Sequence, residues 1–211
     1  MGNLVHLSQA KNDMSRKLSK SYLLVSVAMM STLAIILDVL PSVRVPWGMK
    51  IDFVGTVWVL SYFLYGLSVA LPVSIITTLY ITMFSVTGFV GATMKFIATI
   101  PMFLIPALVS HLPFFSNRGS KIFNKLLLII GLCILANVVR LLATITVNYY
   151  WAIPLWTGIP TDKILDAMFN GSILGFVVFV AGMNVLQGVV DILVPWFLGF
   201  KLKLSTMFGT W

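Results

Sequence analysis

The chain has 211 residues, of which 59% are apolar and only 9% are charged. Its mean hydropathy is +1.02. A soluble globular domain usually has about 25% charged residues, and a disordered chain combines low hydrophobicity with high charge, so both classes are excluded. The composition instead predicts an all-α integral membrane protein, because six helices of about 20 residues would use about 120 residues, close to the number of apolar ones.

The charged residues are unevenly distributed. Fourteen Lys and Arg residues face six acidic residues, and the sequence contains no Glu. The basic residues lie between apolar runs, which is typical of the loops of a membrane protein and not of a nucleic-acid-binding surface. The single cysteine, Cys133, lies inside an apolar run, so an intrachain disulfide and a cysteine-rich metal site are both excluded.

Three regions follow from the hydropathy pattern. Residues 1–20 form a polar cytoplasmic N-terminal tail, residues 21–203 a six-helix membrane domain, and residues 204–211 a short C-terminal tail. The expected helices span residues 22–39, 53–65, 67–86, 92–109, 126–150 and 172–200. The uncharged stretch 54–86 is too long for one span, so we expect it to break near Gly66.

The basic residues also predict the topology. An even number of spans puts both termini on one side, and cytoplasmic loops carry an excess of Lys and Arg. With both termini cytoplasmic, the inner side holds Lys11, Arg16, Lys17, Lys20, Arg118, Lys121, Lys125, Lys201 and Lys203. The outer side then holds only Arg44, Lys50 and Lys163. We therefore predict cytoplasmic termini and a multi-pass protein of the cell membrane.

Several catalytic motifs are missing from the sequence. It has no P-loop motif to bind ATP, no H-E-x-x-H zinc motif and no G-x-S-x-G nucleophile motif. His6 and His111 are the only histidines. We therefore expect neither catalysis, nor a cofactor, nor a bound metal.

Two of the expected helices carry stripes of polar residues. Asn137, Arg140, Thr144 and Asn148 follow one another at helical spacing, and so do Asn184, Gln187 and Asp191. Polar groups inside a bilayer are costly and so need a structural or functional reason. Lys95, at the start of another helix, either extends its charge to the outer surface or faces the same interior.

Two arrangements explain the stripes. Arg140 could pair with Asp191 and serve only to hold two helices together. Alternatively, the last three helices could enclose a polar pocket that opens outward, with Asn137, Arg140, Asn148, Asn184 and Gln187 on its wall. The outer segments 44–52 and 148–166 contain Trp, Pro and Gly, which suits a shaped lid, although interfacial anchoring explains their tryptophans equally well.

Four segments resemble a known family, the substrate-binding S-components of energy-coupling factor (ECF) transporters. MKIDF at 49–53 is similar to their L-K-[IL]-D-F segment, and TGFVGATMKFIAT at 87–99 to their G-x-[IV]-G-x-x-x-[NK]-F-[IL]-A segment. NYYWAIPL at 148–155 and MNVLQG at 183–188 resemble N-Y-[FY]-x-x-x-P-[LI] and F-N-[LI]-[IL]-K-G of the riboflavin-specific members. The resemblance covers nearly all of 21–202 and keeps the order and spacing of the segments.

The resemblance implies a function and a set of binding residues. The protein would capture a vitamin, most closely riboflavin, from outside, and separate ATPase subunits and a transmembrane coupling subunit would power its uptake. Asn148, Asn184 and Gln187 would contact the flavin ring, and Asp52, Lys95, Arg140 and Tyr149 would be further contacts. Ala28, Ser31 and Thr32 would form the small face that docks on the coupling subunit.

The sequence departs from the family at two places. The A-x-x-x-A motif of the first helix reads Ala28-Met-Met-Ser-Thr32, with Thr in the second place. Gln187 stands where the riboflavin-specific members carry Lys, and Arg140 could supply the lost charge, which would suit an anionic or more polar ligand. The alternatives are an S-component or solitary carrier for another nutrient, a small membrane enzyme, or a structural subunit without a ligand.

Overall fold

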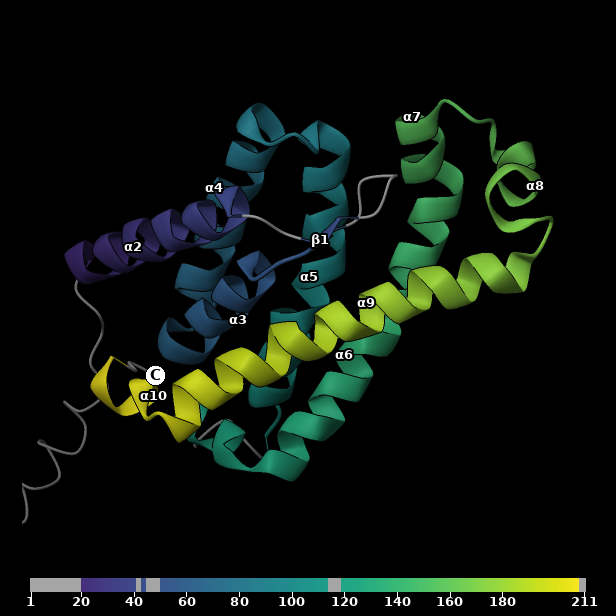
Figure 1. Ribbon diagram of the computed structural model, residues 1–211. Helices are drawn as coiled ribbons and strands as arrows, with labels where there is room; N and C mark the ends of the chain where they lie inside the picture. The colour runs from purple at the N-terminus through teal and green to yellow at the C-terminus, as the bar shows by residue number, and fades with distance from the viewer. Residues whose placement is uncertain (1–19, 41–42, 45–49, 114–118, 209–211) are drawn as a thin grey trace, which may run out of the picture.

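The computed structural model describes residues 20–40, 43–44, 50–113 and 119–208. Among the described residues, the fold is a helical bundle with a short β-hairpin made of two strands of two residues each (Figure 1). In chain order the elements are α2 (Lys20–Val39), β1 (Val43–Arg44), β2 (Lys50–Ile51), α3 (Val54–Tyr65), α4 (Leu67–Phe84), α5 (Gly88–Ser110), η1 (Gly119–Asn124), α6 (Leu126–Val147), η2 (Asn148–Ala152), α7 (Ile153–Thr157), η3 (Thr161–Lys163), α8 (Ile164–Phe169), α9 (Ile173–Trp196), η4 (Phe197–Lys201) and α10 (Leu204–Met207). The tail 1–19 and Trp47 of the expected lid lie outside the described residues.

The six expected helices correspond to α2, α3, α4, α5, α6 and α9. Within the part of the chain that the structure describes, five helical segments are long and apolar enough to cross a bilayer. The other helix, α3, has 12 residues and is therefore only about 18 Å long, short of the roughly 30 Å hydrocarbon core. A multi-pass membrane protein is thus supported, whereas the count of six spans and the side of the termini remain predictions.

The short helix α3 forms the centre of the bundle. All of its residues are buried, and it packs against α2, α4, α5 and α9. Such burial explains why α3 is apolar on every side, since a helix without a polar face must be covered all round. The predicted break near Gly66 is confirmed, because this glycine has φ 78°, a backbone conformation that ends α3 and starts α4.

One helix continues well past its predicted end. The helix predicted over 126–150 continues from α6 through the π-helical turn η2 into α7, and ends at Gly158 with φ 71°. The connection that follows folds into η3 and α8 and leads to α9, whose first turn is capped by the Ser172 hydroxyl, which accepts a hydrogen bond from the amide of Gly175 at 3.0 Å. A small apolar cluster, Ile153, Ile164, Phe176 and Val180, holds these segments together.

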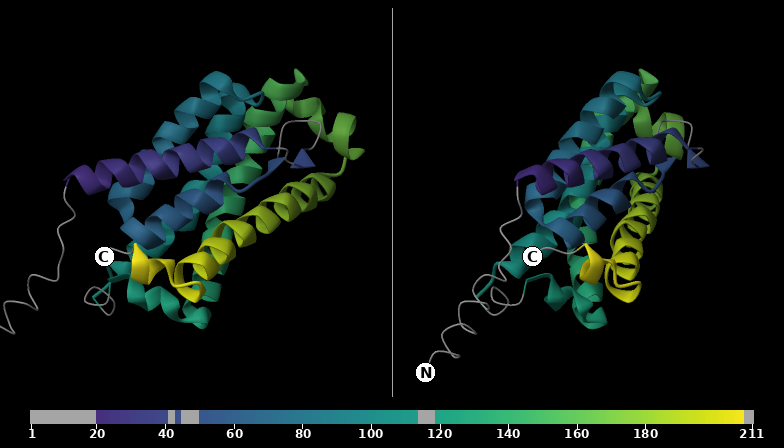
Figure 2. Two further views of the ribbon diagram at one scale, coloured as in Figure 1. Left: turned by 60° about the vertical axis from the view of Figure 1, so that its left-hand side comes forward. Right: turned by 90° about the vertical axis from the view of Figure 1, so that its left-hand side faces the viewer.

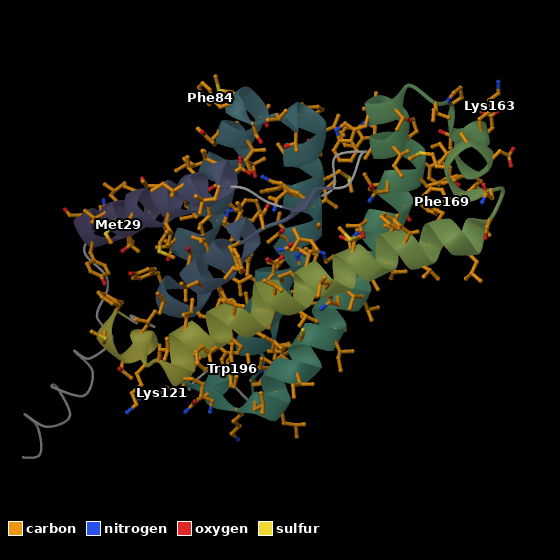
Figure 3. All side chains as sticks on the ribbon, in the orientation of Figure 1. Met29, Phe84, Lys121, Lys163, Phe169 and Trp196 are labelled. Carbon is orange, nitrogen blue, oxygen red and sulfur yellow. The ribbon has the colours of Figure 1, made fainter. Side chains whose placement is uncertain are left out.

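Different elements lie at the two ends of the bundle. One carries the hairpin, the α4–α5 turn, α7 and α8, and the other carries η1 and α10 (Figures 1 and 2). At the second end the expected C-terminal tail contains the helical turn α10. The carbonyl of Phe208, directly after this turn, accepts a hydrogen bond from the Tyr22 hydroxyl of α2 at 3.4 Å. Lys121 and Trp196 also lie at this end, far from Lys163 beside α8 (Figure 3).

Candidate functional site

A polar cavity of about 560 Å³, including its open mouth, lies between α5, α6 and α9. β2 and α7 also contribute to its wall, through Lys50 and Trp156. These elements meet at the end of the bundle that carries the hairpin (Figure 1). The cavity is therefore built from the three helices in which the sequence placed a pocket, together with parts of both loops expected to cover it.

Five of the residues expected to bind a ligand line this cavity: Lys95, Arg140, Asn148, Asn184 and Gln187. Three other expected residues lie outside its wall. Asp52 is behind two of the lysines, Asn137 donates from Nδ2 to the Cys133 carbonyl at 2.9 Å, and the Tyr149 ring packs 5.4 Å from that of Phe176. The expected wall is thus reproduced except at Asn137, whose side chain bonds to its own helix and packs against Gly188 of α9.

Lys50, Thr87 and Trp156 line the cavity although the sequence did not single them out as ligand contacts. Residues two apart in an extended segment lie on the same side, so Lys50 and Asp52 could have been paired from their spacing. The position of Trp156 depends on the π-helical turn that redirects α6 into α7, and no pattern in the sequence indicates that turn.

Arg140 takes part in both of the expected arrangements. Its Nη1 donates to Asp191 Oδ2 at 3.0 Å, and its Nε donates to Asn184 Oδ1 at 3.1 Å. The side chain also lines the cavity, while Asp191 is fully buried behind it. The ion pair and the pocket were alternatives at the level of sequence, and the structure contains both.

A second ionic group lies at the hairpin. Lys95 Nζ is 2.5 Å from both oxygens of Asp52, and Lys50 is 3.4 Å from Asp52 and also pairs with Asp38 of α2. Asp52 precedes α3, and although burial acts to raise the pKa of its carboxyl group, the two lysines outweigh that effect and hold the pKa below its ordinary value. The group joins the hairpin to α2 and α5.

Both N–H groups of the Gln187 amide and one lone pair of its oxygen are used by protein contacts. Its Oε1 accepts from the Asp52 amide at 3.1 Å, and its Nε2 donates to the Asp52 carbonyl at 2.7 Å and to Asp191 Oδ1 at 2.8 Å. Gln187 therefore connects the start of α3 to the buried ion pair. Although it lines the cavity, its amide groups are already used by the fold.

Asn148 differs from Gln187 in that its amide oxygen is not used in a contact within the described residues. Its Nδ2 donates to the Thr144 carbonyl at 2.7 Å, whereas its Oδ1 has no hydrogen-bond partner among the described residues. The residue is fully buried and lines the cavity. Since buried polar atoms are nearly always hydrogen-bonded, this oxygen is a candidate acceptor for an N–H or O–H of a ligand.

The described residues contain no group of three or more His, Cys, Asp or Glu side chains placed to hold a metal ion. Asp38, Asp52 and Asp191 are each paired with a cationic side chain. The arrangement is thus suited to binding a polar organic molecule through hydrogen bonds and charge.

No family model matches the sequence, and no curated protein matches it. The fold does match a solved structure, described as "Structure and mechanism of the S component of a bacterial ECF transporter". The two chains are 21% identical, the match covers 88% of this chain and 97% of that one, and the TM-score is 0.65. This chain has the fold of that S component. The expectation of an S-component-like architecture is confirmed, and the likeness at this identity concerns the fold alone.

The residues expected to contact a coupling subunit lie on two faces of α2. Ala28 and Thr32 are exposed, one helical turn apart. Ser31 is 4% exposed and points into the bundle beside Ala34, which is fully buried. The exposed small face of α2 thus contains Ala28 and Thr32, and Ser31 belongs to the packed side.

Proposed function

We propose that this protein is the substrate-binding subunit of an ECF-type transporter and that it captures riboflavin or a related flavin from outside the cell. The observation that carries the proposal is the polar cavity between α5, α6 and α9, which lies at one end of a fold shared with a bacterial S component. Its wall combines apolar side chains with a few polar and charged groups, which is usual for a small-molecule site.

The wall of the cavity suits an aromatic ligand with polar edges. Trp156 offers a flat apolar face against which a ring can pack, and Met94 and Ala98 add apolar surface. Asn148 offers a free acceptor oxygen, and Thr99 adds a hydroxyl that lines the same space. A flavin has both a large aromatic surface and polar ring atoms, so this combination supports the proposal.

Uptake would need energy from other chains. The sequence has no P-loop, so the proposed partners are separate ATPase subunits and a transmembrane coupling subunit. The exposed small side chains of Ala28 and Thr32 would let a partner helix approach α2 closely, as small residues do in membrane interfaces. The excess of basic residues that the sequence predicts on the cytoplasmic side supports an outward-facing cavity in the cell membrane.

A carrier for a different nutrient is the second candidate. Both amide hydrogens of Gln187 are committed to Asp52 and Asp191, so it is not free to donate to the edge of a flavin ring without giving up one of those contacts. This observation favours a ligand that is recognised mainly by the other residues of the wall.

Titration of the detergent-purified chain with riboflavin, followed by the quenching of flavin fluorescence, tests the proposal. We expect saturable quenching that is strongly reduced in Trp156→Ala. Trp151→Ala is the matched control, because the Trp151 ring packs edge-to-face on Phe89 at 5.9 Å and does not line the cavity. The absence of saturable binding to a folded sample would exclude riboflavin as the ligand.

A further inference from the structure

The cavity wall contains three cationic side chains, and each has its carboxylate partner on the side away from the cavity. Lys50, Lys95 and Arg140 line the space, whereas Asp38, Asp52 and Asp191 do not. The three carboxylate side chains are at most 2% exposed in their ion pairs. A molecule in the cavity therefore meets the positive end of each pair.

The remaining hydrogen-bonding capacity of this cluster is on the donor side. Asp52 already accepts from Lys95 and from the Val54 amide, and its carboxylate lies 3.4 Å from Lys50. In the described residues Arg140 uses only Nε and Nη1, so its Nη2 still has hydrogens to donate. Each lysine ammonium also retains an N–H beyond those directed at its carboxylate partners.

The three cations are nearly buried and are not part of a general positive charge on the surface. They come from β2, α5 and α6, and their side chains are 4%, 11% and 5% exposed. Surplus N–H donors on three neighbouring cations are best satisfied by an anionic group, because one such group offers several acceptor oxygens and its charge is attracted to all three cations. A carboxylate or phosphate group supplies both the acceptor oxygens and the negative charge.

We infer that Lys50, Lys95 and Arg140 form an anion subsite, and that the natural ligand carries a carboxylate or phosphate group bound there. This inference rests on the proposed function and narrows its substrate class. The anionic group contacts Nη2 of Arg140 and the lysine ammonium groups, while the rest of the ligand reaches Asn148 and Trp156. Asp38, Asp52 and Asp191 position the three cations and do not touch the ligand.

Two matched ligand pairs test the inference on the detergent-purified full chain. Riboflavin and riboflavin 5′-phosphate differ by a phosphate, and nicotinamide and nicotinate differ by a carboxylate. Dissociation constants are measured for all four by isothermal titration calorimetry. We expect the anionic member of at least one pair to bind about tenfold to a hundredfold more tightly than its neutral partner. A gain of this size corresponds to one or two additional charge-assisted hydrogen bonds.

Two variants connect the preference to the subsite. In the double variant Arg140→Gln, Asp191→Asn both charges are removed together, so no buried charge is left unpaired and Gln187 keeps an acceptor at position 191. We expect its preference for the anionic member to fall at least tenfold. Lys163→Met is the control, since this lysine is exposed beside α8 (Figure 3), and it should keep the wild-type preference. Size-exclusion profiles and unfolding temperatures verify that both variants fold.

The outcomes separate this inference from the proposed function. Equal or weaker binding of the anionic members overturns the anion subsite and leaves riboflavin capture standing. Tight binding of riboflavin 5′-phosphate or nicotinate without binding of riboflavin supports the subsite and removes riboflavin as the ligand. A preference that survives in the double variant overturns the assignment of the subsite to Arg140. Failure of all four compounds to bind a folded sample overturns both proposals.

Discussion

Gln187 and Asp52 are 135 residues apart and exchange two hydrogen bonds through the backbone of Asp52, at 3.1 Å and 2.7 Å. Their contact fixes the start of α3 to the middle of α9. The same amide also holds Asp191, the partner of Arg140. Lys50 of the hairpin, Lys95 of α5 and the buried Arg140 are thus connected through one side chain, so the shape of the cavity depends on Gln187 even if no ligand atom contacts it.

Gln187→Leu should lower the free energy of unfolding by about 1–3 kcal/mol, because it leaves the backbone groups of Asp52 unpaired in a buried site. Thermal unfolding of the purified variant in detergent measures this loss. Leu186→Ala is the control on the same helix, where the side chain is 53% exposed and the loss should be smaller. An unchanged unfolding temperature combined with lost ligand binding would contradict the structural role and favour direct contact.

Arg140→Leu and Asp191→Leu should each destabilise the protein strongly, by about 3–5 kcal/mol, because each leaves its partner as an unpaired buried charge. The double variant should lose much less than the sum of the two. Unfolding temperatures for the four members of this cycle give the coupling. Additive losses would show that the two side chains do not depend on one another for stability.

Asn148→Leu should weaken ligand binding about tenfold with little change in the unfolding temperature, because the lost oxygen has no hydrogen-bond partner among the described residues and only the bond to Thr144 is removed. The binding titration used for the wild type measures the effect. Tyr150→Leu is a neighbouring control whose side chain is 68% exposed. Equal affinity of the wild type and Asn148→Leu would mean that the ligand does not use this oxygen.

Gly188→Ala should destabilise the protein by about 1–3 kcal/mol, because a Cβ at this position would collide with the side-chain amide of Asn137. The cost should largely disappear when Asn137→Ala is already present. Gly182→Ala on the same helix has open space around the added carbon, so it should be neutral or slightly stabilising. Thermal unfolding compares the four proteins, and an equal loss for Gly182→Ala and Gly188→Ala would contradict the close approach of α6 and α9.

The helices and their order could be predicted from the sequence, because a membrane segment must be apolar over its whole length and its polar interruptions are rare. The break at Gly66 followed from length alone, and the polar stripes of α6 and α9 followed from helical spacing. Gly55 and Gly188, which allow Asp191 and Asn137 to lie close against neighbouring helices, carry no comparable signal. A glycine in an apolar run looks the same whether the space beside it is open or filled.

The sequence by itself determined the membrane class, most of the helical boundaries within a few residues, and five of the polar residues around the cavity. Only the tertiary structure decided how those residues are used. Gln187 and Asp52 became a connection within the fold, Asn148 kept an unpaired oxygen, and Lys50 joined the wall of the cavity. The physical reason is that helical spacing determines which face a side chain is on, whereas its hydrogen-bond partners come from segments up to 135 residues away, which only packing brings together.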